Sequence, residues 1–457
     1  MSLRQYRRQR KIEQNKALSV TVRRHLGADA LFKTVRSSFE LVGETRAGKP
    51  EISVADALMS GFAMFSLKDG ALLVFDQRRK NEEHNLRSIY GIKTIPCDTQ
   101  MRTIIDPVPP DELRPAHNAV LSALQRGKAL EKMLYLEEGY LMPLDGTGYF
   151  SSEKLYSDCC LEKISSSGKS VYYLQMLGAA LVHPERKEVI ALIPEIISWQ
   201  DGSAKNDCEL NASRRFLTKF REEHPRLKIV VTQDAISPNG PYILFLKEKD
   251  CRFILNVKET DHTHLFARFD EVVKNGRAGE LILDDSKNPE RFHYLRWANA
   301  LPINASHQDV LVNMLEYYEV TGDVTKRFCW VTDIPLTEEN ICRIMRAGRA
   351  RWKIENETFN TLKNQGYNFE HNYGLGKKYL SMNFVKLMML AFLVDQTQQL
   401  CCALFQAVLK KLGSKKTLWE DMRSLFRCFK LESMEMLYRA LLYGFAKLEP
   451  VIGPDTS

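Results

Sequence analysis

The stretch that decides the fold is Arg349–Lys363, which reads Arg-Ala-Arg-Trp-Lys-Ile-Glu-Asn-Glu-Thr-Phe-Asn-Thr-Leu-Lys. It contains neither glycine nor proline, and Thr337 upstream, followed by two glutamates, is typical of a capped, acidic helix start. A helix has about 3.6 residues per turn, so one face carries Glu355 together with Arg351, Trp352, Thr358, Phe359 and Leu362. This half-apolar face is expected to pack against the protein, with Arg351 one turn before Glu355.

The same stretch contains a second glutamate, Glu357, on the opposite face. A frame that uses Glu357 would place Lys353 one turn before it, where the first frame has Arg351. A solvated Arg–Glu pair on an ordinary amphipathic helix would also show this pattern. The helical face favours Glu355 over Glu357. Whether Glu355 has a functional role depends on acidic residues elsewhere in the chain.

Two aspartates upstream lie near the ends of predicted strands. Tyr140–Thr147 is predicted to be a strand that delivers Asp145 to a turn permitted by Gly146. Leu227–Asp234 contains a near-continuous apolar run, as expected for a central strand buried on both faces. Asp234 follows the carboxyl end of that strand, where open α/β sheets place their ligands. For either aspartate alone, a turn-forming role is the simpler interpretation.

Three carboxylates brought together by folding would form a site of hard oxygen ligands, for which Mg²⁺ or Mn²⁺ is the natural occupant. Two ions about 3.5–4 Å apart can activate a water or hydroxyl and stabilise the leaving oxygen of a phosphoryl displacement. Asp145, Asp234 and Glu355 are therefore the candidate metal ligands. Arg351 and Lys363 complete the candidate catalytic set as cations that face phosphate.

The chain of 457 residues is long enough for two to four structural units. Residues 1–130 are predicted to form a helical, DNA-binding domain, with helices at Ala30–Leu41, Val54–Ser66 and Asp111–Gln125. Residues 131–241 are predicted to begin an α/β core. Its further elements are a helix over 206–223 and short strands at Val171–Leu177, Ala179–His183 and Val189–Pro194.

Residues 242–335 are predicted to form a β-rich insertion. Its strands are expected at Tyr242–Leu246, Arg252–Val257, Leu281–Leu283, Phe292–Trp297, Val312–Tyr318 and Phe328–Thr332. Residues 336–378 return to the core with the Glu355 helix and a loop. Residues 379–457 are predicted to be helical, and the apolar run Phe384–Val394 is expected to be a buried helix too short to span a bilayer.

The composition is that of a soluble globular protein, with 44% hydrophobic and 27% charged residues. The formal charge of +8 is compatible with a polyanionic partner without being diagnostic of one. The ten cysteines contain no Cys-x-x-Cys, so we expect reduced thiols in an intracellular protein. The first residues lack the apolar segment of a signal peptide.

Three groups of residues are candidates for DNA contact. The basic arm at residues 1–33 would either bind phosphates or be solvated, through Arg4, Arg7, Arg8, Arg10 and Lys11. Trp330 would either pack in the core or, as the family resemblance given below implies, stack on an unpaired base near a cleaved end. The loop containing Lys377 and Lys378 has a composition that suits a nucleic-acid backbone, although its aromatics could equally pack on the core.

Four motifs, in this order, resemble the bacterial insertion-sequence transposases of the DDE superfamily. They are Leu144-Asp145-Gly146-Thr147-Gly148-Tyr149-Phe150-Ser151-Ser152, Thr232-Gln233-Asp234-Ala235, Asn239-Gly240-Pro241-Tyr242-Ile243 and Arg351-Trp352-Lys353-Ile354-Glu355. The resemblance covers residues 130–375 and is to the group with a Tyr-Arg-Glu-Lys signature around its catalytic glutamate. A β-rich insertion before the last acid also matches that group.

The resemblance implies an RNase H-like core that binds two Mg²⁺ ions, for which Mn²⁺ may substitute. It implies cutting of double-stranded DNA at transposon ends and attack of the freed 3′-hydroxyls on target DNA. Asp145 and Asp234 would be the two aspartates, Glu355 the glutamate and Arg351 the signature arginine. Lys363 is the nearest match to the signature lysine, one residue later than usual.

The signature tyrosine would fall at Gly348 and is therefore missing. The resemblance also implies a homodimer on DNA, in the bacterial cytoplasm at the nucleoid and away from any membrane. Two alternatives stay open. One is a nuclease on the same core that lacks strand transfer, and the other is a DNA-binding protein with a degenerate catalytic domain.

Overall fold

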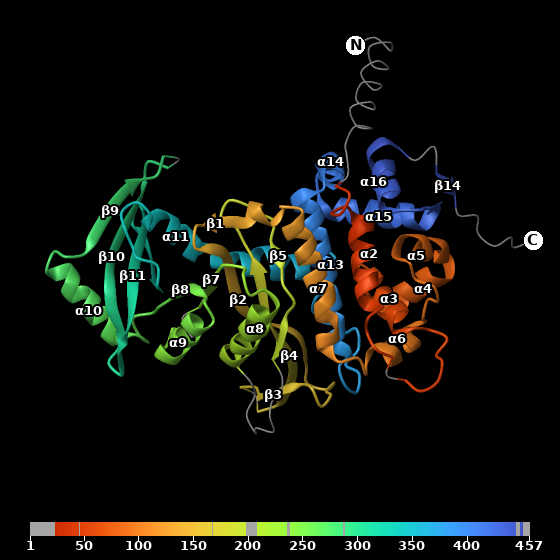
Figure 1. The fold of residues 1–457 in the computed structure, drawn as a ribbon, viewed down its shortest axis with the longest axis horizontal. Helices are drawn as coiled ribbons and strands as arrows, with labels where there is room; N and C mark the ends of the chain where they lie inside the picture. The colour runs from red at the N-terminus through yellow and green to blue at the C-terminus, as the bar shows by residue number, and fades with distance from the viewer. Residues whose placement is uncertain are drawn as a thin grey trace, which may run out of the picture.

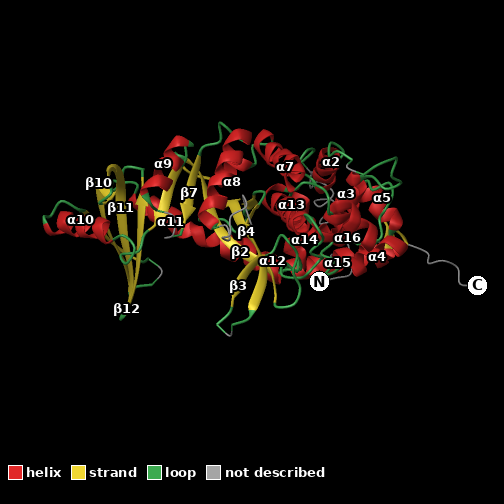
Figure 2. Cartoon of the chain, turned by 90° about the horizontal axis from the view of Figure 1, so that it is seen from below, coloured by secondary structure: helices red, strands yellow, loops and turns green. Residues whose placement is uncertain are grey.

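The computed structural model describes residues 23–44, 46–166, 168–197, 208–234, 238–286, 288–444 and 448–450. The molecule is elongated, with a helical end, a central sheet and a β-rich end (Figure 1). The helical end combines the first and last parts of the chain. Seen from below, the strands run from the β-rich end to the middle and most helices gather at the other end (Figure 2).

The central sheet is built around β2 (Gly139–Ser152). On one side β2 pairs antiparallel with β4 (Ser170–Leu181), and on the other it pairs parallel with β7 (Ile229–Gln233). Beyond β7 lies β8 (Arg252–Asn256), again parallel. All five residues of β7 are buried, as predicted for a central strand.

Short strands complete this part of the sheet. The outer edge of β4 carries β3 (Leu161–Ile164), β5 (Ile190–Ala191) and β6 (Glu195–Ile197), while β1 (Leu134–Leu136) pairs with β2. The helix α8 (Glu209–Glu223) connects β6 to β7, and α9 (Gly240–Glu248) connects β7 to β8. Both helices are seen on the same side of the sheet (Figure 2).

The β-rich end extends the same sheet. It consists of β12 (Val324–Thr332), β11 (His307–Thr321), β10 (Arg291–Asn304) and β9 (Gly279–Asp284), in that order outward from β8. The predicted strands at 252–257 and from 281 onward are therefore present. A helix that was not predicted, α10 (Thr263–Lys274), packs on β10.

The predicted strand Tyr242–Leu246 is wrong, because these residues lie in the helix α9. Asn239 caps that helix, since its side chain accepts a hydrogen bond from the backbone N–H of Tyr242 at 3.0 Å. Pro241 occupies the first turn, where its missing N–H costs nothing. The apolar residues alone suit a strand or a helix, and the cap Asn239 together with Pro241 favours the helix.

The strand β2 is longer than predicted. It continues past Asp145 to Ser152, and Asp145 pairs with Gly178 of β4 in the middle of the ladder. Asp145 is therefore a strand residue, and the turn predicted at Gly146 does not exist. The two predicted strands Val171–Leu177 and Ala179–His183 are likewise one continuous strand, β4, which ends at Leu181.

The helical end is organised around α13 (Leu380–Cys401), which is buried along almost its whole length, as predicted for 384–394. The N-terminal helices α2, α3, α4, α5, α6 and α7 lie at Ala28–Phe39, Val54–Ser66, Leu72–Asn81, Glu83–Tyr90, Asp98–Ile105 and Arg114–Arg126. The C-terminal helices α14, α15 and α16 lie at Ala403–Leu412, Lys415–Cys428 and Met434–Tyr443. Within the described residues no single helix has the length and apolar composition to cross a membrane, and α13 with α14 meets that test only as a pair bent by 91°.

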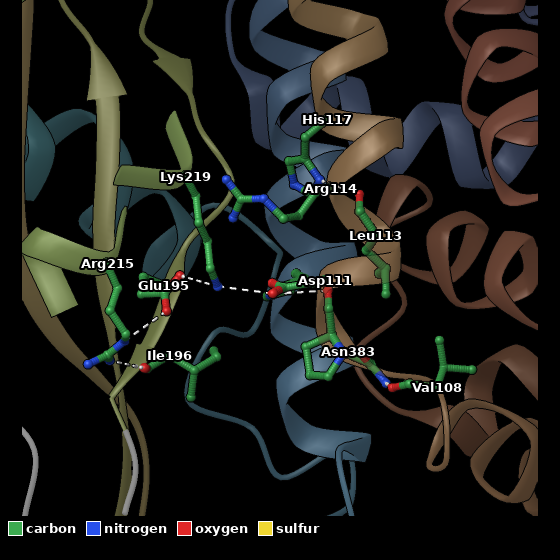
Figure 3. A network of polar contacts seen from close by, with 12 residues as sticks. Val108, Asp111, Leu113, Arg114, His117, Glu195, Ile196, Arg215, Lys219 and Asn383 are labelled. Carbon is green, nitrogen blue, oxygen red and sulfur yellow. Dashed lines mark hydrogen bonds and ion pairs between the residues drawn. The ribbon is translucent and has the colours of Figure 1, made fainter. Parts of the chain in front are cut away.

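A polar network joins the sheet to the helical end (Figure 3). Lys219 of α8 contacts Asp111 at 3.0 Å and Glu195 of β6 at 3.4 Å. Arg215, one turn earlier on α8, also binds Glu195, at 3.1 Å. Asp111 lies in the short helix η1 (Pro110–Leu113), whose Pro110 carbonyl accepts a hydrogen bond from the buried Lys386 of α13. The network fixes the position of α8 against the helical end.

Candidate active site

The two aspartates belong to neighbouring parallel strands: Asp145 lies within β2, and Asp234 directly follows the carboxyl end of β7. In the register of β2 and β7, Pro143 is opposite Thr232. Asp145 and Asp234 each come two residues after that pair, and adjacent strands are about 4.8 Å apart. This is the edge of the sheet at which open α/β proteins bind their ligands.

The glutamate segment is helical but not a regular α-helix. It consists of α11 (Ile341–Arg349), the 3₁₀ turn η3 (Ala350–Trp352), the π-helical segment η4 (Ile354–Phe359) and α12 (Asn360–Asn364). Arg351, Thr358, Phe359 and Leu362 are buried, as predicted. Trp352 is 51% exposed, so the prediction that it lies on the packed face is wrong. The change from 3₁₀ to π winding shifts the angle between successive side chains, which a uniform helix does not allow for.

The glutamate segment packs on the sheet because β4 has a glycine at the contact. Gly178 is directly opposite Asp145 and faces the same side of the sheet. A Cβ atom at Gly178 would lie 2.6 Å from Cε1 of Phe359 and 3.6 Å from Cδ1 of Ile354. The missing side chain lets η4 approach β4, and this brings Glu355 next to Asp145.

Arg351 links the first and third candidate carboxylates. Its Nη1 lies 3.2 Å from Oδ2 of Asp145, 206 residues away in the sequence, and 3.4 Å from Oε1 of Glu355. The guanidinium is buried, and its Nε has no hydrogen-bond acceptor among the described residues. One buried cation therefore serves two carboxylates.

The surroundings of Asp145 favour its protonated form. Burial raises the pKa of Asp145 to about 7, and the neighbouring Glu355 and Glu209 act in the same direction, while Arg351 opposes them. A further positive charge near this carboxyl group would lower its pKa, because a cation stabilises the ionised form. The site thus has an excess of negative charge that Arg351 alone does not balance.

Glu209 is a fourth carboxylate near this site, and the sequence interpretation missed it. It begins α8 and accepts a hydrogen bond from Nε2 of Gln175 at 3.2 Å. A Cβ atom at Gly146 would lie 2.0 Å from Oε1 of Glu209, so this approach requires glycine at 146. Burial raises the pKa of Glu209, and the charge of Asp234 raises it further. In the sequence Glu209 looks like an acid in the first turn of a helix, and only the fold places it beside Gly146.

Glu357 and Lys363 contact other residues than the shared arginine. Burial lowers the pKa of Lys415 on α15, and the charges of Asp395 and Glu357 oppose this shift. Lys353, the arginine counterpart in the Glu357 frame, donates a hydrogen bond to the carbonyl of Arg186 at 2.6 Å. Nζ of Lys363 pairs with Oε1 of Glu370 at 2.8 Å. These contacts bring together Asp145, Arg351 and Glu355, whereas Lys363 pairs with Glu370.

Trp330 is 2% exposed and packs face to face with Phe328 in the core, as the alternative interpretation expected. Stacking on a base would require the ring to leave this place. A Cβ atom at Gly348 would lie 2.6 Å from Nε1 of the same indole. A side chain at position 348 would therefore overlap the indole of Trp330.

Lys377 and Lys378 are exposed, and their backbone N–H groups donate to the Asp106 carboxylate at 3.0 and 2.9 Å. Their ammonium groups remain candidates for DNA contact. The basic cluster Arg4, Arg7, Arg8, Arg10 and Lys11 lies outside the described residues.

The donor chemistry of the site fits a divalent metal, since carboxylate oxygens are the preferred ligands of Mg²⁺ and Mn²⁺. In the described part of the chain, however, no group of three or more His, Cys, Asp or Glu side chains is arranged to hold one. Here Arg351 is the cation that contacts oxygens of both Asp145 and Glu355.

Comparison with known proteins gives similarity among solved structures only. No protein-family model matches the chain, and no curated protein matches it. Among solved structures, the chain is similar to the piggyBac transposase in a cryo-EM structure of its synaptic complex with hairpin DNA. The two chains are 12% identical, with 94% of this chain and 85% of the other covered and a TM-score of 0.39.

Proposed function

We propose that this chain is a DDE transposase with an RNase H-like core. The support comes from the sheet, in which an antiparallel strand β4 and two parallel strands β7 and β8 flank β2, with α8 crossing between the two halves. The pairing of β6 with β4, followed by β2, β7 and β8, is consistent with an RNase H-like sheet. The insertion of β9 to β12 before the glutamate segment fits the same group of transposases.

One observation carries the proposal. Asp145 and Glu355 come from distant parts of the chain and meet on Arg351, beside the strand end that holds Asp234. An ordinary amphipathic helix would leave its Arg–Glu pair in solvent, whereas here the arginine is buried against the first aspartate. Carboxylates on two neighbouring parallel strands and on a packed helical segment are suitable ligands for metal-dependent phosphoryl transfer.

In this function Asp145, Asp234 and Glu355 would hold Mg²⁺ or Mn²⁺, with Glu209 adding negative charge nearby. The bound ions would activate a water or 3′-hydroxyl and stabilise the leaving oxygen at the scissile phosphate. Asp145 must lose its proton to bind a cation, and its raised pKa makes metal binding release that proton near neutral pH. Arg351, once its carboxylates are neutralised otherwise, can bind a phosphate oxygen.

The substrate would be double-stranded DNA carrying the ends of an insertion sequence, followed by a target duplex. Two ends must be brought together, so a homodimer on DNA is the expected assembly. A net charge of +8 is consistent with such a polyanionic partner. We propose the bacterial cytoplasm, at the nucleoid, as its place of action.

The test uses a DNA duplex that contains the inverted repeats flanking the reading frame, with Mg²⁺. Wild-type protein should nick the repeat ends and join their 3′ ends to a second duplex. Asp145→Asn, Asp234→Asn and Glu355→Gln should each lower nicking at least about 1,000-fold, because each removes a metal ligand, while DNA binding stays within a few-fold. Glu357→Gln is the matched control and should remain active.

The outcomes separate the alternatives. Nicking without joining would indicate a nuclease, and binding without nicking would indicate a degenerate DNA-binding protein. Full activity of Glu355→Gln together with loss in Glu357→Gln would contradict the assignment of the third carboxylate.

A further inference from the structure

A polar cleft of about 730 Å³ opens beside the carboxylates. It is lined by Gly148, Phe150, Ser151, Lys163, Tyr173, Gln175, Lys363 and Glu370. Gln175 connects it to the site, since its amide donates to Glu209, which lies against Gly146. None of the chemistry assigned to Asp145, Asp234 and Glu355 uses this cleft.

The cleft combines an aromatic ring with two ammonium groups. The ring of Tyr173 is half-buried on β4, and Nζ of Lys163 on β3 lies 5.3 Å from its centroid. Lys363 reaches the cleft from the glutamate segment, on the other side. Its partner Glu370 is mostly exposed, so their ion pair is weak and a phosphate can replace the carboxylate. Lysines from two separate elements thus face the same space.

An aromatic face flanked by lysines is the chemistry that recognises single-stranded nucleic acid. A base stacks on the ring and the backbone phosphates lie on the ammonium groups. A base paired within a duplex is stacked on its neighbours and cannot reach a half-buried ring. A bare duplex would contact the lysines but would make no use of Tyr173.

We propose that this cleft binds an unpaired nucleic-acid strand, with a base on Tyr173 and phosphates on Lys163 and Lys363. The inference deepens the proposed function and rests on it, since an unpaired strand beside the carboxylates is the end exposed by DNA cleavage. The cleft is thereby a binding site for the strand next to the scissile phosphate, separate from the residues that hold the metal.

The test measures binding of a fluorescein-labelled oligothymidylate of about ten nucleotides by fluorescence anisotropy, with EDTA so that no cleavage occurs. Tyr173→Ala should raise the Kd about tenfold and Tyr173→Phe should leave it nearly unchanged, because stacking needs the ring and not the hydroxyl. Lys163→Ala should raise the Kd and lower the slope of log Kd against log salt by about 0.7. Thermal melting of each variant checks that it is folded.

Lys169→Ala is the matched control. It removes the same charge from an exposed position in the β3–β4 hairpin, outside the cleft, where Lys169 pairs with Glu153. Its Kd should stay close to that of the wild type. Equal effects of Lys163→Ala and Lys169→Ala, together with an unchanged Kd for folded Tyr173→Ala, would overturn the proposal.

The two proposals fail in different ways. If wild-type protein binds the oligothymidylate through Tyr173 but does not nick end DNA with Mg²⁺, the transposase proposal fails and the binding site stands. If it nicks end DNA while the cleft variants bind the oligothymidylate like wild type, the binding site fails alone. Binding of a fully paired duplex with the same loss in Tyr173→Ala would also contradict an unpaired ligand.

Discussion

At the residue scale, Arg351 is the side chain that connects two of the candidate carboxylates, Asp145 and Glu355. It is buried, and its Nη1 approaches two carboxylates that the proposed function assigns to metal ions. Arg351 balances the charge of these carboxylates here, and a divalent cation held by the same oxygens would compete with it for their negative charge.

This competition predicts the behaviour of Arg351→Ala. Removing the guanidinium leaves Asp145 and Glu355 without their shared cation, so the variant should bind Mn²⁺ several-fold more tightly than wild type in isothermal titration calorimetry at pH 8. Arg351→Lys should lie between the two. The same Arg351→Ala variant should nick DNA more slowly, because it lacks the phosphate contact. Weaker Mn²⁺ binding in folded Arg351→Ala would show that the arginine supports the metal site and does not compete for it.

At the element scale, the contact between β4 and η4 determines whether the third carboxylate reaches the first. Interiors are close-packed, so the small gap at Gly178 cannot take an extra side chain without moving the helix. The π-helical winding of η4 adds to this, because π segments are uncommon and often occur at functional sites.

Gly178→Val should therefore push Phe359, and with it Glu355, away from Asp145. We expect a loss of about 1–3 kcal/mol in the free energy of unfolding, measured with urea, and a larger relative loss of nicking. Phe359→Ala in the Gly178→Val background should restore part of the activity, since it reopens the space. Gly148→Ala is the control for stability, because a Cβ there meets only the Leu174 carbonyl at 3.8 Å. No recovery in the double variant would show that the contact does not position Glu355.

At the scale of the whole molecule, α13 and the network in Figure 3 hold the sheet against the helical end. Lys386 is the buried cation of that junction, and burial lowers its pKa to about 8. In the unfolded chain it binds its proton up to about pH 10.5. Between these values the unfolded state holds more protons, so this group makes the protein more stable as pH rises from about 8 to about 10.5. Below pH 8 the cost of the buried charge is fully present.

Lys386→Met should therefore raise the melting temperature at pH 7, by an amount equivalent to about 1–3 kcal/mol, and the difference should shrink as the pH approaches 10. The comparison is made by differential scanning fluorimetry across this pH range. Lys219→Met, which removes a partly exposed lysine of the same network, should show no such pH trend. A destabilised Lys386→Met at every pH would mean that the hydrogen bond to Pro110 outweighs the buried charge.

Local patterns predicted many elements but not all of their ends. Val54–Ser66 lies where the helical periodicity placed it, because its cap, Ser53, and its apolar content are local features. Tyr242–Leu246 was misassigned because apolar runs of that length suit a strand or a helix equally. The extent of β2 beyond Asp145 depends on pairing with β4, a partner that no local pattern specifies.

The sequence by itself determined which chemical groups are available, namely the acids at 145, 234 and 355 and the arginine at 351, one turn before the last acid. It also determined where many helices and strands end, because caps, prolines and glycines act on their near neighbours. Only the tertiary structure decided that Glu355 and not Glu357 meets Asp145, that Glu209 joins them, and that Lys363 faces a cleft. The reason is physical. Winding and capping depend on near neighbours, whereas these meetings depend on where Gly146 and Gly178 leave room for other elements to approach.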